Sequence, residues 1–135
     1  MKTVNLDGHT TEWKICGHLL QSSINRAARS SLHLQARNLF VAIFPTLKIF
    51  EECPIPVNDK QILYLDFYIP LRNLAIEVHG EQHYKFISFF HNNPSVFALQ
   101  KKNDKLKQDW CSKNGIDIII LPYNEDINEW RSKLQ

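Results

Sequence analysis

The chain has 135 residues and a formal net charge of +2, and it is 44% hydrophobic and 11% aromatic. This composition is typical of one globular domain and excludes an intrinsically disordered chain. No apolar run approaches the roughly 18 residues that a membrane span needs, so we expect no membrane partner. Three scattered cysteines without a CxxC pair exclude a zinc ribbon and favour a reducing, intracellular setting.

The N-terminal part is polar and carries little sign of a core. We expect residues 1–11 to be loose, residues 1–29 to form an N-terminal arm and a helix, and residues 30–135 to form the core of the same single domain. Arg26 and Arg29 stand among small residues and could contact phosphate, because the guanidinium group matches phosphate geometry. An ordinary helix or loop surface is the alternative.

An amphipathic helix is predicted next, beginning at a capping Ser30 or Ser31 and ending near Phe44. Its apolar side chains recur at three- and four-residue steps: Leu32, Ala36, Leu39, Phe40 and Ile43. Such a stripe is expected to pack on a sheet.

The first strand of that sheet is predicted at residues 47–53, where side chains alternate. Pro54 and Pro56 should end it, because proline lacks the N–H group that a strand ladder needs. One of the two acids near its end, Glu51 or Glu52, could approach the face that carries the acids of the next strands, with Glu51 preferred.

A hairpin is predicted over residues 63–79, where two alternating runs flank a short turn. The apolar rows are Leu63, Leu65, Phe67 and Ile69 in the first run and Leu74, Ile76 and Val78 in the second. An even-length loop around Leu71-Arg72 puts Asp66 opposite Glu77 and His79 on their face. The same register puts both apolar rows on one side.

Two carboxylates that converge on a sheet repel each other, and a divalent cation removes that repulsion. Oxygen ligands suit Mg²⁺, which takes the rest of its shell from water and phosphate. The imidazole of His79 could move a proton. The pattern therefore favours metal-assisted phosphodiester hydrolysis, and two surface acids on a half-exposed hairpin are the alternative. Zinc held by His79 and His83 is disfavoured, because that spacing suits a helix and His79 ends a strand.

A long helix is predicted from Asn93-Pro94, a cap followed by a first-turn proline, to Asn114-Gly115. Its apolar stripe is Phe97, Leu99, Leu106 and Trp110, and its lysines are Lys101, Lys102, Lys105, Lys107 and Lys113. Gln100, Asp104 and Lys107 recur at steps of four and three residues and should lie on one side.

The remaining elements are a strand at Asp117–Leu121 and a last helix that packs through Ile127, Trp130 and Leu134. The continuous apolar run of the strand suits an interior, parallel position beside the hairpin. The order of elements predicts an α/β fold, with helices on both sides of a mixed four-stranded sheet.

One stretch resembles a known group of enzymes. Asp66 followed by Glu77-Val78-His79 resembles the core of the PD-(D/E)xK nuclease superfamily, with His where Lys is usual. The run LDFYIPLRNLAIEVHGEQH is similar to the very-short-patch-repair (Vsr) endonucleases and their homing-endonuclease relatives, in which a strand Asp precedes a His-Gly pair and a second His. Asp66, His79-Gly80 and His83 stand at those places, although the second His comes one residue sooner than in the repair enzymes.

This resemblance implies roles for the matching residues. Asp66 would be the main metal ligand and Glu77 a second acid at the metal, while His79 and His83 would transfer protons or assist the leaving group. Asp104 matches an acid on the helix after the histidines. It would orient a histidine, or hydrogen-bond a metal ligand without touching the metal itself.

Two points remain open in this comparison. An ion pair of Asp104 with Lys107 on the same helix is the alternative to a role at the histidines. The family's acid on the preceding helix has no clear match, and Glu51 or, more remotely, Glu12 could take its place.

The resemblance also implies a restriction-endonuclease-like α/β/α sandwich and a Mg²⁺-dependent endonuclease, in which Mn²⁺ can substitute. We expect DNA as the partner, a nick from one chain or a double-strand cut from a homodimer, and a cytoplasmic setting in a bacterial or phage-infected cell. The DNA backbone would be held by Arg26, Arg29, Lys101, Lys105 and Lys107. The rivals are a nuclease-fold DNA-binding module without chemistry and an RNA-directed nuclease of the same fold.

Overall fold

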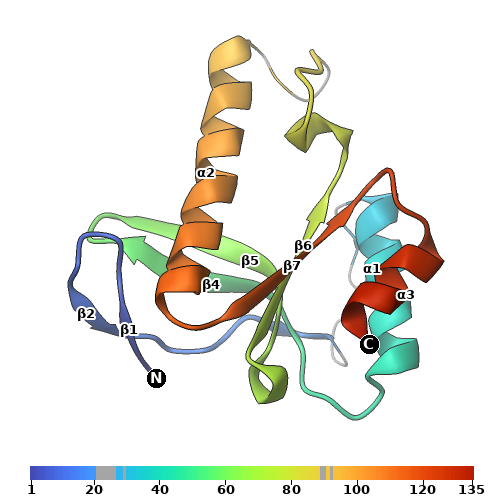
Figure 1. Cartoon of the computed structure of the whole chain (residues 1–135), viewed down its shortest axis with the longest axis horizontal. Helices are drawn as coiled ribbons and strands as arrows, with labels where there is room; N and C mark the ends of the chain where they lie inside the picture. The colour runs from blue at the N-terminus through green and yellow to red at the C-terminus, as the bar shows by residue number, and fades with distance from the viewer. Residues whose placement is uncertain (21–26, 29, 89–90, 92) are drawn as a thin grey trace.

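The structure is a computed structural model that describes residues 1–20, 27–28, 30–88, 91 and 93–135. Figure 1 shows a twisted sheet with α1 and α3 on one side and α2 on the other. The strands are β1 (Lys2–Val4), β2 (Thr10–Glu12), β3 (His18–Leu19), β4 (Phe50–Asn58), β5 (Gln61–Ile69), β6 (Leu74–His79) and β7 (Asp117–Pro122). The helices are α1 (Ser31–Ile43), α2 (Pro94–Lys113) and α3 (Ile127–Leu134), with short 3₁₀ turns η2 (Pro70–Arg72) and η3 (Glu81–His83).

The main sheet is mixed, as predicted, but it has five strands in the order β3-β4-β5-β6-β7 rather than four. The additional strand is the two-residue β3, which is too short to leave a pattern in the sequence. The parallel pairing of β7 with β6 is confirmed. The predicted interior position of β7 is wrong, because β7 forms an edge and its first residues remain partly exposed.

Two apolar cores lie on opposite faces of this sheet. The α1-side core consists of Leu20, Ala36, Leu39, Phe40, Phe44, Ile49, Phe67, Ile69, Leu74, Ile76, Val78, Leu121, Trp130 and Leu134. The α2-side core consists of Trp13, Cys53, Ile55, Val57, Leu65, Tyr68, Ala75, Trp110, Cys111 and Ile116. Helices therefore cover both faces, which is the layering that the order of elements predicted.

Helices α1 and α2 begin and end where the sequence indicated. Ser30 caps α1 by accepting from the His33 N–H group, and Asn93 caps α2 by accepting from two N–H groups of its first turn. Asn114 is the C-cap of α2. The stripe predicted for α2 is only partly right, because Leu99 is 55% exposed and the buried residues gather at the C-terminal end of the helix. The N-terminal half of α2 is thus free to carry polar contacts.

Residues 1–11, which were predicted to be loose, instead carry β1 and the start of β2. The side chain of Asn5 organises the turn of the β1–β2 hairpin by accepting from the N–H groups of Asp7 and His9. Trp13 is 2% exposed in the α2-side core. The polar sequence gave little indication of this element, because its turn depends on the side chain of Asn5 and few of its residues are apolar.

Strand β4 continues through the two prolines that were expected to end it. The carbonyl of Pro54 accepts from the indole of Trp13, which marks the side of β4 that faces away from β5. Pro56 lies two residues further and directs its backbone the same way. Neither proline nitrogen faces β5, so the missing N–H groups cost no ladder bond.

The regular alternation of faces is interrupted at Glu52 of β4 and Asp66 of β5, and we call this irregularity the crease. Glu52 has a φ of 53° in the middle of β4, and it lies across from Asp66, between the partners of Leu65 and Phe67. Leu65 packs in the α2-side core and Phe67 in the α1-side core. The prediction that the row from Leu63 to Ile69 shares one face is therefore wrong, because the left-handed residue turns the faces over.

The buried cysteines give a first testable prediction. Burial raises the pKa of Cys53 to about 11 and that of Cys111 to about 12, and both residues are 0% exposed. Native iodoacetamide should modify Cys16, which is partly exposed, and leave the other two as thiols. Mass spectrometry of digested protein should find all three modified only after unfolding, and native labelling of Cys53 would contradict this packing.

Candidate functional site

The α2 side of β6 carries the polar residues that the sequence singled out. Strands β5 and β6 pair Phe67 with Ile76 and Ile69 with Leu74, so Asp66 lies opposite Glu77 in the register that was predicted. The connection between the strands runs from residue 70 to residue 73, an even number, which preserves that parity.

Asp66 and Glu77 replace the strand ladder at this point with bonds through their side chains. The backbone N–H group of Asp66 donates to Glu77 Oε2 at 2.6 Å, and the N–H group of Val78 donates to Asp66 Oδ2 at 2.8 Å. Lys107 of α2 donates from Nζ to Glu77 Oε1 at 2.7 Å. Each carboxylate thus accepts from the backbone of the opposite strand.

The electrostatics of this group are dominated by burial. Asp66 is 6% and Glu77 2% exposed. Burial and then the charge of Asp66 raise the pKa of Glu77, and the ammonium of Lys107 opposes them. Burial lowers the pKa of Lys107, but the carboxylates of Glu77 and Asp66 outweigh it and raise the pKa. A lysine cation therefore sits at a place where two buried carboxyl groups meet.

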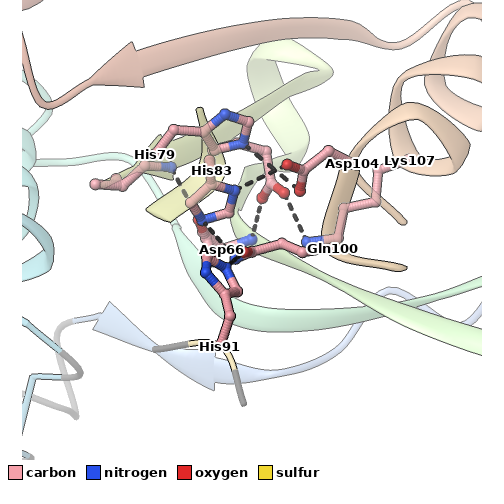
Figure 2. A network of polar contacts seen from close by, with 9 residues as sticks. Asp66, His79, His83, His91, Gln100, Asp104 and Lys107 are labelled. Atoms are coloured by element: carbon pink, nitrogen blue, oxygen red, sulfur yellow. Dashed lines mark hydrogen bonds and ion pairs between the residues drawn. The ribbon is translucent and has the colours of Figure 1, made fainter. Parts of the chain in front are cut away.

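Two stacked imidazoles lie beside the carboxylates (Figure 2). The rings of His79 and His83 are 4.1 Å apart and parallel within 5°. Asp104 accepts from His83 Nδ1 through Oδ2 at 2.8 Å, and its Oδ1 lies 4.0 Å from His79 Nε2. That Nε2 is buried and has no hydrogen-bond partner in the described part of the chain. Burial, with the neighbouring His83, lowers the pKa of His79 to about 4, although Asp104 and Asp66 oppose it.

His79, His83 and Asp104 could hold a metal ion by distance alone, because their ligand atoms lie within 4.8 Å of one another. Ring geometry opposes this. An imidazole nitrogen binds a metal along a direction in its own ring plane, at about 2.0–2.1 Å for zinc. Parallel stacked rings cannot both point at one ion, so a ring would have to rotate. The arrangement suits proton transfer better than metal binding.

Gln100 and His91 extend this cluster, although no role was predicted for either residue. Gln100 contacts His83 Nε2 at 3.3 Å through Nε2 and His91 Nε2 at 2.8 Å through Oε1. Helical spacing had put Gln100 on the side of α2 that carries Asp104 and Lys107, and it does lie there. His91 is 2% exposed in the loop before α2, where no periodicity could identify it.

The alternative pairing of Asp104 with Lys107 is not what the structure has, since they bind His83 and Glu77 respectively. The preference for Glu51 as a further acid is also wrong. Glu51 is 1% exposed and forms a two-pronged ion pair with Arg37 of α1, toward the opposite layer. The crease at the next residue explains this, because it inverts which residues of β4 face α2.

The remaining described candidates have other partners. Glu12 bonds the N-terminal ammonium group at 2.9 Å, and Glu52 lies 3.8 Å from His18. Lys101 is exposed and lies over the ring of Phe97. Lys105 is also exposed and pairs with an acid one turn further along α2. Arg26 and Arg29 lie outside the described residues.

Comparison with known proteins identified viral relatives of part of the chain. The chain is 43% identical over 66 residues to Uncharacterized protein 307L of Invertebrate iridescent virus 6, and the match covers 49% of this chain and 34% of the relative. It is 36% identical over 76 residues to Uncharacterized protein 033L of Invertebrate iridescent virus 3, covering 56% and 38%. Uncharacterized protein 094L of Frog virus 3 is 36% identical over 79 residues, covering 57% and 51%. The matches thus span a third to a half of the relatives' length. No family model and no solved structure matches.

Proposed function

We propose that this chain is a divalent-metal-dependent DNA endonuclease with a restriction-endonuclease-like core. One observation carries the proposal: two buried carboxyl groups from adjacent strands, Asp66 and Glu77, lie beside a stacked histidine pair backed by Asp104. Acids, imidazoles and a lysine that converge in this way are typical of hydrolytic sites and uncommon in a purely structural cluster.

Asp66 and Glu77 suit a Mg²⁺ or Mn²⁺ ion, because both offer hard carboxylate oxygens. Glu77 already binds a cation, the ammonium of Lys107, which indicates how strongly this spot favours positive charge. A bound ion would supply charge neutralisation at the scissile phosphate. An ion held by Asp66 and Glu77 would compete with Lys107 for the Glu77 carboxylate, so the lysine would have to move aside or share it.

The remaining residues of the chain supply protons and positions. Asp104 orients His83 by accepting from Nδ1, and the stack fixes the plane of His79 against His83. Because its pKa is lowered to about 4, His79 is neutral at physiological pH. Its unprotonated ring nitrogen can therefore accept a proton without a prior deprotonation step. Lys107 takes the place of the motif lysine that His79 replaces, and it approaches from α2 instead of from β6.

The exposed lysines of α2 complete the proposal. Lys101 and Lys105 lie on the same helix as Asp104 and would hold the DNA backbone near the histidines. A single site per chain favours a nick, and a double-strand cut would need two copies of the chain. The net charge of +2 leaves the rest of the surface little general attraction for DNA, so binding should depend on these local groups. Viral relatives are compatible with action inside an infected cell.

A plasmid assay tests the activity. Supercoiled DNA is incubated with the native chain and Mg²⁺, Mn²⁺ or EDTA, and the conversion to open circles is followed on a gel. We expect nicking with either ion and none with EDTA. Mismatched, branched and single-stranded DNA and RNA are added as competitors in parallel, which identifies the preferred nucleic acid. No metal-dependent cleavage of any of these substrates would end the proposal.

A nuclease-fold binding module without chemistry is the main rival, and one observation favours it. Each carboxylate oxygen of Glu77 already has a donor within the protein, Lys107 Nζ on Oε1 and the N–H group of Asp66 on Oε2. A chain that binds duplex DNA with the salt dependence of phosphate contacts, yet never nicks it, would identify this rival.

Replacing Lys107 by Met distinguishes two explanations of its ion pair with Glu77. Either the pair only stabilises the fold, or the ammonium group occupies the proposed metal site. Without metal, the variant should lose about 1–3 kcal/mol of stability, because the buried carboxyl group of Glu77 loses the hydrogen bond and the charge of Lys107. At mildly alkaline pH, Mg²⁺ should raise the melting temperature of the variant more than that of the native chain, since no ammonium competes. Lys105→Met, on the exposed face of α2, is the control. Equal Mg²⁺ effects in all three proteins would contradict the metal assignment.

A further inference from the structure

A chain of hydrogen bonds runs from the backbone before α2 to the stacked histidines (Figure 2). The N–H group of Ile87 donates to His91 Nδ1 at 3.0 Å, and His91 Nε2 contacts Gln100 Oε1 at 2.8 Å. Gln100 Nε2 contacts His83 Nε2 at 3.3 Å, and His83 Nδ1 contacts Asp104 Oδ2 at 2.8 Å. Every polar atom of the His91 ring is thereby engaged inside the protein.

One end of this chain has a known direction, because a backbone N–H group can only donate. His91 Nδ1 therefore accepts, and the hydrogen of the His91 ring lies on Nε2. That hydrogen is donated to the carbonyl oxygen of Gln100, which leaves the amide NH₂ group of Gln100 to donate to His83 Nε2. His83 then carries its hydrogen on Nδ1 and donates it to Asp104.

The opposite arrangement fails at both ends. Turning the amide of Gln100 around would point its NH₂ group at the N–H group of His91, with two donors face to face. A hydrogen on His83 Nε2 would likewise face the NH₂ group of Gln100. Because buried donors without acceptors are costly, one tautomer is favoured along the whole chain.

We propose that His91 and Gln100 are positioning residues that hold His83 as the Nδ1–H tautomer and so make its Nε2 the proton-accepting atom of the site. This inference rests on the proposed nuclease function for its chemical meaning. It assigns different roles to the two stacked histidines, because no such series of hydrogen bonds holds His79. The Nε2 atom of His79 is buried without a partner among the described residues.

The proton balance of the reaction follows from this assignment. As a water oxygen bonds to phosphorus, its proton passes to His83 Nε2 and displaces the weak contact with Gln100. The bond from phosphorus to the leaving oxygen breaks, and that oxygen receives the proton from His83 Nε2 or from solvent. The Nδ1 hydrogen stays on His83 and is donated to Asp104 throughout, and the Asp104 carboxylate stabilises the transient imidazolium.

Tautomer-specific NMR of the full chain tests the inference without any substrate. With ¹⁵N-labelled histidine, and His83 assigned through a His83→Gln variant, the native protein should show Nδ1 protonated and Nε2 unprotonated. The carboxylate of a Gln100→Glu variant has the same shape as the amide but accepts hydrogen bonds from both His91 and His83. His83 should then carry a hydrogen on both ring nitrogens, whereas the native ring carries one. Gln108→Glu places the same charge change on the exposed face of α2 and should leave the His83 signals as in the native chain.

His91→Phe provides a second variant, because Phe86 and Phe97 already surround that ring at 5.7 and 5.1 Å. Gln100 is then free to turn, and His83 should show a mixture of tautomers. If the native chain nicks DNA, Gln100→Glu should slow nicking about 100-fold at unchanged DNA affinity. A native His83 with hydrogen on Nε2, or a Gln100→Glu variant with native signals, would overturn the inference. Native tautomer signals in a chain that never cleaves would instead reject the nuclease function alone.

Discussion

Arg37→Met is expected to lower the free energy of unfolding by about 3–5 kcal/mol, because it removes the charge and the hydrogen bonds that Arg37 gives the buried carboxylate of Glu51. The two side chains are 7% and 1% exposed, and two guanidinium nitrogens of Arg37 donate to the two carboxylate oxygens. Such a loss corresponds to a drop in melting temperature on the order of 10–20 °C for a domain of this size. Thermal unfolding followed by circular dichroism measures it.

The double variant Arg37→Met with Glu51→Met is the decisive companion. Replacing both residues by apolar groups of similar length removes both charges of this pair, so most of the lost stability should return. The double variant should also keep any nicking activity, because Glu51 faces α1 and not the histidines. Loss of cleavage in a well-folded double variant would show that Glu51 belongs to the site after all. A stability change below about 1 kcal/mol for Arg37→Met would show that the pair is unimportant.

The sequence predicted the centre of the site because local rules decide it. Apolar alternation in β5 and β6 and an even connection place Asp66 across from Glu77, and the observed turn kept that parity although it is longer than the minimal loop. The i, i+4 and i+7 spacing on α2 likewise brought Gln100, Asp104 and Lys107 to one side. These are relationships between residues close in the chain, and periodicity reports them directly.

The parts that could not be predicted depend on long-range contacts or on single backbone angles. Nothing in the residues around Glu52 shows that it adopts a φ of 53°, yet this angle turns Glu51 away from Asp66. The tolerance of Pro54 in β4 depends on which edge of the strand is open, which only the assembled sheet decides. His91 joins the cluster through Gln100 on the next helix, a contact without a sequence period.

Asp66→Asn is expected to reduce metal-dependent nicking by about 100-fold or more while the protein stays folded. Asn keeps the shape and one oxygen of the native side chain, so the bond from the Val78 N–H group can persist. What disappears is the negative charge that would hold the metal. Asp117→Asn is the matched control, because Asp117 is exposed and pairs with Leu74 at the opposite end of β6 from His79. Plasmid nicking and thermal unfolding are measured on the same preparations.

Stability distinguishes the functional explanation from a structural one. The charge of Asp66 raises the pKa of Glu77, so the two acids repel each other in the resting fold. Removing that charge should leave the melting temperature equal to or above the native value, while cleavage is lost. An acid whose charge costs stability but is needed for cleavage would fit selection for a catalytic role. If Asp66→Asn instead unfolds the chain several degrees earlier and the native protein never nicks DNA, the carboxyl group is a structural brace between β5 and β6.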